Sequence, residues 1–325
     1  MRSAIALAAL GAITLVAQET PVIRVPVHLV TVPTLVFSKE GQLVPGLRAA
    51  DFRIFDNGRA QIAVLDVDSN QVSVVLAIQA NQDVREYIPF IAKVGSIVEA
   101  LLVGESGEAT VVTYADQVAV AKPFDTADVP SAFKKLSATG QQARMIDAGL
   151  QAISLLKQRP GSRTRVLLLI GQPVDIGSES SLALLQEQAQ KKNVVIHALT
   201  LPEIGKAFVS DTFSLNGVSS TAKGGFQAGV DLKNLVSVLH RTSSAQGSAD
   251  PFSVLTAATG GTQLHFRKQN ELERAITALG VELRSSYLLS YSPNPADAGY
   301  HQIKVEVAVA GATVYTRPGY WLSAN

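Results

Sequence analysis

The sequence predicts an α/β fold: a doubly wound, mostly parallel sheet inserted into a small antiparallel β-sandwich that both chain ends form. Between residues 70 and 285, apolar β-branched runs alternate with segments whose apolar residues recur at helical spacing. This alternation is typical of a parallel sheet covered by helices. Residues 22–66 and 286–322 instead contain short strand patterns and turn residues. Since a few strands cannot bury two faces alone, we expect both ends to form one sandwich.

The composition excludes several classes of protein. A length of 325 residues suggests two domains of ordinary size, and a hydrophobic content of 47% is ample for a core. The net charge of +1 gives no electrostatic basis for binding nucleic acid or an anionic membrane. Because the chain has no cysteine, it has no disulfides, no thiolate metal site and no cysteine nucleophile.

Residues 1–18 have the pattern of a cleaved export signal. Arg2 supplies the positive start, residues 4–16 are apolar, and residues 15–18 form a plausible cleavage region. No later stretch reaches the roughly 18 apolar residues of a membrane-spanning helix, so we expect no stable membrane insertion after cleavage. Export without cysteine favours a bacterial protein of the periplasm, the cell envelope or the secreted fraction.

The N-terminal end is predicted to form strands joined by tight turns. Pro26 and Pro33 interrupt the first strand and are expected at edges or bulges, because proline removes a ladder donor. Asn57-Gly58 is a strong signal for a two-residue hairpin. The other predicted elements of this end are strands at 23–37 and 50–56, a turn at 39–42 and a returning strand at 62–66.

The middle of the chain alternates between strand and helix patterns. Strands are predicted at 72–78, 109–114, 118–120, 165–170, 194–199 and 264–266. Helices are predicted at 84–102, 146–156, 182–189, 251–259 and 272–283. Asp250-Pro251 is typical of a helix start and Gly260-Gly261 of a helix end.

Two stretches follow a different pattern. Residues 203–250 are rich in Ser, Gly, Thr and Ala and are predicted to form a long surface insertion, with a short helix at 232–239. From residue 286 onward the chain again has strand patterns, at 287–291, 303–307 and 314–316.

Several motifs in a particular order relate the chain to a known family. They are Gly46-Leu47, Asp51-Phe52, Phe55-Asp56-Asn57-Gly58, Tyr114 before Asp116, Asp147-Ala148, Ala257-Ala258-Thr259-Gly260-Gly261, Leu283-Arg284-Ser285-Ser286-Tyr287-Leu288-Leu289-Ser290-Tyr291 and Arg317-Pro318-Gly319-Tyr320, together with the strands at 74–78 and 166–170. On these motifs the chain resembles a von Willebrand factor A (vWA) domain protein, of the VWFA-related subfamily typical of Acidobacteria. The resemblance covers nearly all of the chain after the signal, except residues 203–250.

The resemblance implies a metal-ion-dependent adhesion site built from three loops, and this chain departs from it in each loop. Gln79 stands where the family has the Asp of an Asp-x-Ser-x-Ser loop, and Asn81 and Asp83 stand at its two Ser positions. Ala143 stands at the position of the second-loop Thr, and Gln172 at that of the third-loop Asp. The family pattern is therefore degenerate in all three loops.

Such a site is expected to bind no metal and no cofactor. A hard cation such as Mg²⁺ prefers oxygen ligands that include one or two carboxylates. Here two carboxylates are amides and one hydroxyl is a methyl group. Asp83 and Asp175 remain nearby, so weak cation binding stays an alternative.

Other candidate sites have weaker signals. The five His residues (His28, His197, His240, His265, His301) have no metal-binding spacing, although a zinc site assembled in space stays an alternative. A calcium loop starting at Asp66 would have Gln71 and Ala77 where it needs Gly and Glu. No Gly-x-Ser-x-Gly elbow or phosphate loop is present, so a hydrolase is the least favoured interpretation.

Aromatic residues cluster in the last strand patterns. They are Tyr287, Tyr291, Tyr315, Tyr320 and Trp321. Such residues pack well on strands, which favours the core and rim of the sandwich. An aromatic recognition surface is the alternative, because rings offer a large contact area at low entropy cost.

The sequence thus predicts an exported, non-enzymatic binding or adhesion-type protein. It would recognise a protein partner through the strand-end loops without a metal, because amide groups both donate and accept hydrogen bonds. The predicted binding residues are Gln79, Asn81, Gln82, Asp83, Ala143, Gln172 and Asp175. The alternative is a structural or assembly component of a cell-envelope complex that uses residues 203–250 or the sandwich edge.

Overall fold

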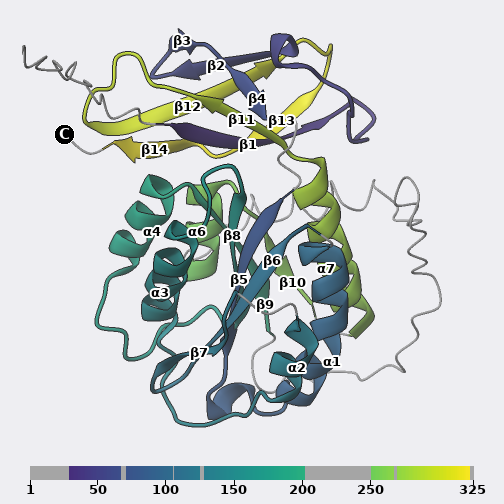
Figure 1. Cartoon of the computed structure of the whole chain (residues 1–325), viewed down its shortest axis with the longest axis vertical. Helices are drawn as coiled ribbons and strands as arrows, with labels where there is room; N and C mark the ends of the chain where they lie inside the picture. The colour runs from purple at the N-terminus through teal and green to yellow at the C-terminus, as the bar shows by residue number, and fades with distance from the viewer. Residues whose placement is uncertain are drawn as a thin grey trace, which may run out of the picture.

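A six-stranded sheet lies at the centre of the larger of two stacked units in the computed structural model (Figure 1). The structure describes residues 29–66, 71–104, 106–124, 128–201, 250–266 and 269–322. The predicted export signal, the start of the first strand and the helix at 232–239 lie outside these residues, as does all of the 203–250 segment except Asp250.

The strand order of this sheet is that of a doubly wound fold. Its strands are β5 (Val72–Gln79), β6 (Glu108–Tyr114), β7 (Val118–Lys122), β8 (Thr164–Gly171), β9 (Val194–Thr200) and β10 (Gln263–His265), in the order β10-β9-β8-β5-β6-β7. Only β7 is antiparallel to its neighbour. The predicted mostly parallel α/β sheet is confirmed. The order reverses between β5 and β8, where ligands of such sheets usually bind.

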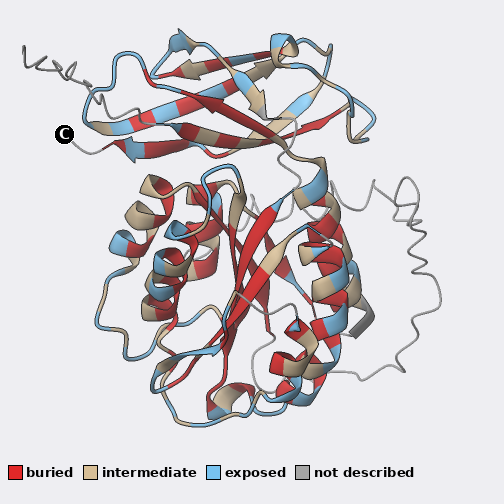
Figure 2. Cartoon of the chain, viewed as in Figure 1, coloured by how far each residue is buried: buried red, intermediate tan, exposed pale blue. Residues whose placement is uncertain are grey.

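Helices cover both faces of this sheet. The helices α1 (Ile88–Val98), α2 (Val129–Lys134) and α7 (Gln269–Ser285), with the π-helical turn η3 (Glu99–Val103), pack on one face. The helices α3 (Met145–Lys157), α4 (Leu182–Lys191) and α6 (Pro251–Thr259) pack on the other. Every residue of β5 is buried (Figure 2), because alternate side chains enter the two apolar layers. None of the helices in the described ranges is long and apolar enough to cross a membrane.

The first predicted helix begins later than its periodicity indicates. A 3-10 turn, η2 (Gln82–Val84), follows β5, and the α-helix starts at Ile88 with Pro89 in its first turn. Proline is preorganised for that position, so it helps to define where the helix begins. The short helix α2 was not expected from the sequence, since six residues show too little periodicity.

The smaller unit consists of two four-stranded antiparallel sheets. One contains β13 (Thr313–Thr316), β1 (Val30–Phe37), β11 (Tyr287–Tyr291) and β4 (Val64–Asp66). The other contains β14 (Gly319–Leu322), β12 (Gly299–Val307), β2 (Phe52–Asp56) and β3 (Arg59–Gln61), with the 3-10 turn η1 (Ala49–Asp51) before β2. Each sheet takes strands from both ends of the chain. Val32, Ile54, Leu289 and Val305 belong to one buried cluster that the two sheets share.

At the N-terminal end, the predicted hairpin turn is present, but the predicted last strand differs from the structure. Asn57 and Gly58 have φ of 47° and 78°, as the two-residue hairpin between β2 and β3 requires. The predicted returning strand at 62–66 is wrong as a single element. The chain leaves β3 after Gln61 and crosses to the other sheet, where β4 pairs with β11. Ile62 lies at the crossing and is 88% exposed.

Pro33 lies inside β1, which has neighbours on both sides. It pairs with Leu288 of β11, whereas the pairing with β13 begins only at Thr34. Pro33 therefore lies where β1 has β11 as its single neighbouring strand. On the opposite side of β1, the missing N–H of proline removes no hydrogen bond between strands.

Arg317 joins the sandwich to the α/β unit. Its buried guanidinium donates to the Asn193 side-chain oxygen at 2.9 Å, and to the backbone oxygens of Thr31, Gln190 and Gly319 at 3.3, 3.2 and 3.0 Å. All four acceptors are carbonyl oxygens, and that of Gln190 lies in the last turn of α4, which carries partial negative charge. Burial lowers the pKa of Arg317 to about 10, so it stays charged at neutral pH.

The glycine pair predicted to end a helix has a second role at this junction. Gly260 ends α6 in the left-handed region, with φ of 78°. A Cβ on Gly260 would lie 2.7 Å from the backbone nitrogen of Arg317. The helix end therefore approaches the sandwich more closely than any side chain allows.

Replacing Arg317 by Lys should destabilise the whole protein. Lysine has three donors on one nitrogen and cannot reach four separated carbonyl groups. Leaving buried acceptors without partners is expected to lower the free energy of unfolding by about 2–4 kcal/mol. Urea denaturation checks this, with exposed Arg85→Lys as the matched control. Equal stability of the two variants would contradict the role of Arg317.

Glu282 of α7 is a buried acid whose surroundings offer little compensation for its charge. Thr262 Oγ1 donates to it at 3.1 Å, and the neighbouring His197 Nδ1 accepts the Thr262 backbone N–H at 3.0 Å. Burial lowers the pKa of His197 to about 3, so it is neutral, and raises the pKa of Glu282 to about 7.

Stability should therefore fall as the pH rises toward neutrality. The pKa of Glu282 is 4.5 in the unfolded chain, as for an ordinary glutamate, and burial raises it to about 7 in the folded chain. This difference stabilises the folded chain by ~3 kcal/mol below the unfolded-state pKa, and the stabilisation is lost as the pH rises through the folded-state pKa. Glu282→Gln should remove the Glu282 part of this loss, so that in urea denaturation stability falls less between pH 5 and pH 8 than in the unmutated protein. Exposed Glu86→Gln is the control and should retain the loss.

Candidate functional site

The predicted binding residues lie on loops at the carboxyl ends of the parallel strands, at the end of the α/β unit remote from the sandwich (Figure 1). We call Gln79, Asn81, Gln82, Asp83, Ala143, Gln172 and Asp175 the strand-end site. Four of them, Gln79, Asn81, Asp83 and Gln172, meet in one hydrogen-bond network, and the other three lie around it.

Gln79 is the centre of this network. Its Oε1 accepts the backbone N–H of Gln172 at 2.6 Å, and its Nε2 donates to Asn81 Oδ1 at 2.9 Å. A longer contact of 3.5 Å joins its Nε2 to Gln172 Oε1. Gln79 and Asn81 are fully buried and Gln172 nearly so. One amide side chain therefore links the loop after β5 to the loop after β8.

Asn81 extends the network in two further directions. Its Nδ2 donates to Asp83 Oδ2 at 3.0 Å and to the backbone oxygen of Gln141 at 3.3 Å. The loop before α3 is thereby bound to the loop after β5. An amide can do this because it donates and accepts at once, whereas a carboxylate at either position would only accept.

Ala143 and Asp175 stabilise the loops without joining the amides. Ala143 is buried and exchanges backbone hydrogen bonds with Ile176 at 3.0 and 2.9 Å. Asp175 Oδ1 accepts the backbone N–H of Ile146 at 2.8 Å and the hydroxyl of Ser178 at 2.7 Å. A carboxylate there satisfies a free N–H in the first turn of α3 and interacts favourably with the helix dipole.

Two further carboxylates that we did not assign to the site hold the same loops. Asp116 Oδ1 accepts the backbone N–H groups of Gln141 and Gln142 at 2.8 Å each, and these bonds lower the pKa of Asp116. Asp147 accepts the backbone N–H groups of Glu179 and Ser180 at 3.0 and 3.2 Å. Both aspartates belong to motifs that carry the family resemblance, and these motifs could have identified them as residues of the site.

Tyr114 lies directly beneath the network. Its hydroxyl is buried and has no hydrogen-bond partner, and desolvation raises its pKa. A Cβ on Gly171 would collide with this hydroxyl and lie 2.8 Å from Gln79 Oε1. Gly171 is thus required for the close packing of β6, β5 and β8 at this end, which no local sequence pattern indicated.

The donor set does not fit a hard divalent cation. Among the described residues, no three His, Cys, Asp or Glu side chains gather where they would hold a metal. At the strand-end site, Asp83 is bonded to Asn81 and Asp175 to α3. The two amides are bonded to each other, and none of these groups is arranged around a vacant position for Mg²⁺.

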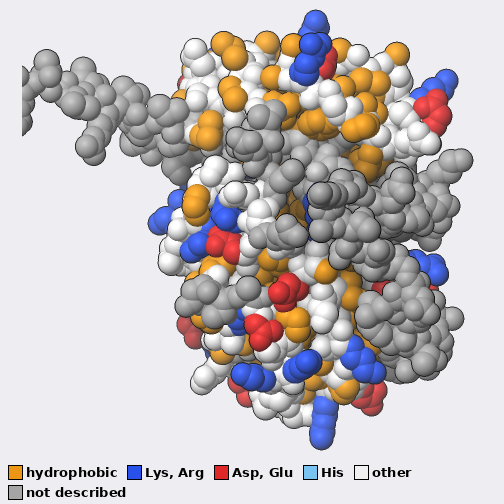
Figure 3. Space-filling model, turned by 45° about the vertical axis from the view of Figure 1, so that its right-hand side comes forward, with side chains coloured by type: hydrophobic (Ala, Val, Ile, Leu, Met, Phe, Trp, Pro, Cys, Tyr) orange, Lys and Arg blue, Asp and Glu red, His pale blue; other side chains and the backbone are white. Residues whose placement is uncertain are grey.

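The surface around the buried amides is mixed in polarity. Gln82 is exposed, Asp83 is half-buried, and Val174 and Ile176 of the third loop are 37% and 47% exposed. At this end of the molecule, Lys and Arg side chains are interspersed with Asp and Glu (Figure 3). The exposed part of the site therefore offers apolar and amide groups rather than a field of one sign.

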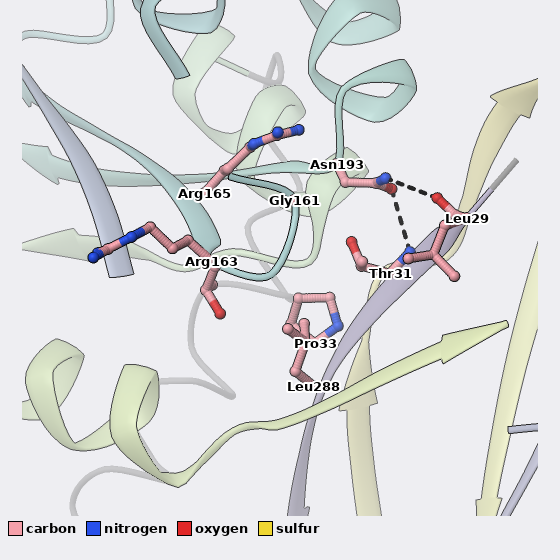
Figure 4. Close-up of a pocket in the computed structure, with 9 residues that line it drawn as sticks. Leu29, Thr31, Pro33, Gly161, Arg163, Arg165, Asn193 and Leu288 are labelled. Carbon is pink, nitrogen blue, oxygen red and sulfur yellow. Dashed lines mark hydrogen bonds between the residues drawn. The ribbon is translucent and has the colours of Figure 1, made fainter. Parts of the chain in front are cut away.

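A cavity of about 210 Å³ lies between the two units (Figure 4). Arg163 and Arg165 line it, and the Arg163 side chain points away from Thr31 and Pro33. Arg163 donates to the backbone oxygens of Val72 and Ser106, and Arg165 to those of Arg159 and Lys192. Asn193 binds Leu29 and Thr31 across the junction. These bonds make the cavity part of the joint between the units.

The histidines and aromatic residues of the described chain are mainly structural. His197 is a buried, hydrogen-bonded core residue, His265 is exposed, and His301 pairs with Asp56; His28 and His240 lie outside the described residues. Tyr291 and Tyr320 are buried in the sandwich. Trp321 is 42% exposed and meets the ring of Tyr300 edge-on at 5.6 Å. Of the calcium-loop candidate at residues 66–77, residues 67–70 lie outside the description, and residues 72–77 belong to the buried strand β5.

No protein-family model matches the chain, and no curated protein is similar to it. Solved structures similar to it include the conserved hypothetical protein BatB from Bacteroides thetaiotaomicron, with 12% identity over 66% of this chain and 98% of that chain and a TM-score of 0.43. A von Willebrand factor type A protein from Catenulispora acidiphila has 10% identity over 92% and 76%, with a TM-score of 0.44. An aerotolerance-related membrane protein from Bacteroides fragilis has 12% identity over 63% and 96%, with a TM-score of 0.39.

Mg²⁺, Mn²⁺ and Ca²⁺ at millimolar concentration should cause no saturable shift in melting temperature. A metal that binds the folded state alone would stabilise it by about 2.7 kcal/mol at a hundredfold excess over Kd. The variant Gln79→Asp, Asn81→Ser, Asp83→Ser, Ala143→Thr, Gln172→Asp should show a metal-dependent shift, because it introduces the ligands of the vWA pattern that the sequence resembles. A saturable shift in the unmutated protein, lost in Asp83→Ala, would show that the chain has a different cation site.

Proposed function

We propose that this chain is an exported, non-enzymatic binding protein that recognises a protein partner through its strand-end site without a metal. The observation that carries the proposal is the Gln79 network, which joins the loops after β5 and β8 by direct hydrogen bonds. In vWA domains, which the chain resembles, a cation and its ligands occupy the corresponding loops. Here the amides supply that connection themselves.

The buried and exposed members of the site have different tasks in this proposal. Gln79, Asn81 and Gln172 are too buried to touch a partner, so they hold the loops in one conformation. Gln82, Val174 and Ile176 are exposed beside them and form the contact surface. Preorganised loops favour binding because less conformational entropy is lost on association. The apolar side chains and the amide suit a protein surface of mixed polarity.

Export to the periplasm, the cell envelope or the medium is part of the same proposal and rests on the pattern of residues 1–18. Mass spectrometry of the protein from its native cell tests it. A mature N-terminus near Gln18 or Glu19 supports export, and an intact Met1 on a cytosolic product contradicts it.

Polar substitution of the exposed apolar pair should weaken partner binding without unfolding the protein. A photo-crosslinking residue at position 82 is expected to capture the partner in native envelopes, and Val174→Ser with Ile176→Ser should reduce the captured amount at least tenfold. Surface changes of this kind usually alter stability by less than about 0.5 kcal/mol. The control is Val120→Ser, since Val120 is 43% exposed on β7. Equal loss in both variants would contradict binding by the third loop.

A second candidate function is an assembly role for the sandwich. Ile62 and Val64 are 88% and 57% exposed beside the short edge strands β3 and β4. Exposed apolar residues at sheet edges favour association with another chain. Ile62→Ser with Val64→Ser would then reduce the crosslinked complex where the loop variant leaves it unchanged.

A further inference from the structure

A polar group of four side chains lies inside the sandwich, apart from the strand-end site. Asp56 of β2 and His301 of β12 are 4% and 3% exposed. Tyr291 of β11 and Tyr320 of β14 complete the group and are also buried. It therefore joins three strands of the C-terminal end to a strand of the N-terminal end, across both sheets.

Both ring nitrogens of His301 face oxygen atoms at short distance. Nε2 lies 2.6 Å from the backbone oxygen of Asp297, and Nδ1 lies 2.6 Å from Asp56 Oδ1. A backbone carbonyl can only accept a hydrogen bond, so Nε2 must carry a proton. The remaining question is where the proton between Nδ1 and Asp56 resides.

The two tyrosines bind the other carboxyl oxygen of Asp56. Their hydroxyls donate to Asp56 Oδ2 at 2.8 Å from Tyr291 and 2.7 Å from Tyr320. Burial, followed by the hydrogen bond to Asp56, raises the pKa of both tyrosines, so they keep these protons at neutral pH. A carboxylate that accepts two hydroxyl bonds is stabilised in its charged form. With Asp56 ionised, an unprotonated Nδ1 would place a lone pair against a negative oxygen.

We propose that Asp56 and His301 form a buried carboxylate–imidazolium pair, and that the imidazolium proton is a pH-sensitive lock on the sandwich. With both nitrogens protonated, His301 donates to Asp56 and to Asp297 at once. Loss of one proton removes one of these two bonds and leaves the Asp56 charge buried without a counter-charge, which is strongly unfavourable.

The lock also holds the segment between β11 and β12. The backbone of Asp297 is bound to His301, and Asn294 exchanges hydrogen bonds with the Gln61 side chain at 3.1 and 3.2 Å. A cavity of about 140 Å³ lies against this segment and is lined by Asp56, Asn57, Arg59, Gln61, Pro295, Asp297 and His301. Release of Asp297 would therefore open the segment on the side of this cavity.

Other charged and titratable groups surround the pair. The carboxylates of Asp56 and Asp297 favour the imidazolium, whereas Arg59 on the cavity wall opposes it. Arg317 lies over the ring of Tyr320 at 5.6 Å and also opposes it. The Tyr320 ring lies 4.8 Å from that of His301 and is neutral. The ionised Asp56 at 2.6 Å is the nearest of these charges and dominates.

The sign of the pH dependence follows from the extra proton of the folded state. The stabilisation is complete below the pH at which an unfolded histidine loses its proton and is lost as the pH rises further. Glu282→Gln should be the background, because Glu282 titrates with the same sign. In that background the unfolding constant should rise by up to about tenfold per pH unit above pH 6.5.

The variant Asp56→Asn removes the proton dependence and keeps the hydrogen bonds. An asparagine amide donates to a neutral Nδ1, and its oxygen accepts from the tyrosines. We expect that, in the Glu282→Gln background, the unfolding constant of the Asp56→Asn variant does not rise steeply between pH 6 and pH 9. Urea denaturation measures this constant. Identical pH profiles with and without Asp56→Asn would overturn the proposal.

Nitrogen NMR of the full chain tests the pair even if that variant does not fold. At pH 6, both ring nitrogens of His301 should have the chemical shifts of protonated nitrogens, and one should lose this signature as the pH rises. The His301→Gln spectrum assigns the signals. An unprotonated Nδ1 at pH 6 would overturn the proposal.

Discussion

The buried guanidinium of Arg317 is the interaction on which the arrangement of the two units depends. It binds carbonyl oxygens at the end of α4, on Asn193 just after this helix, on β1 and at the start of β14. Guanidinium suits this place because its planar fork reaches several acceptors and stays charged when buried. Asn193 and the close approach of Gly260 complete the joint. The sandwich is thereby held at the amino ends of the parallel strands, which leaves their carboxyl ends accessible.

At the strand-end site, amide side chains join loops that come from separate parts of the chain. Parallel strands leave loops of separate chain segments side by side, and those loops require a cross-link. A cation needs carboxylates, whereas Gln79, Asn81 and Gln172 satisfy one another through donors and acceptors of their own. Because these amides are buried, the recognition that we propose falls to the exposed residues beside them.

Two buried carboxyl groups of the described residues, Glu282 and Asp56, differ in their partners. Glu282 has no counter-charge, so folding favours its neutral form. Asp56 has a histidine and two tyrosine donors, so the same cost of burial is offset by partners. Glu282 belongs to the α/β core, and Asp56 joins the two ends of the chain in the sandwich.

The sequence by itself determined the elements whose signals are local. The apolar runs of β5, β8 and β9, the Asp250-Pro251 helix start and the Asn57-Gly58 turn depend on a few neighbouring residues. The family resemblance also assigned Gln79 and Gln172 to two loops of one predicted site, and hydrogen bonds join these two residues. The tertiary structure alone decided the crossing of β4 to the second sheet, the position of Asp175 on α3 and the bonds of Arg317. These features depend on groups that are far apart in the chain. The periodicity of a sequence does not indicate which distant acceptor a buried donor will bind.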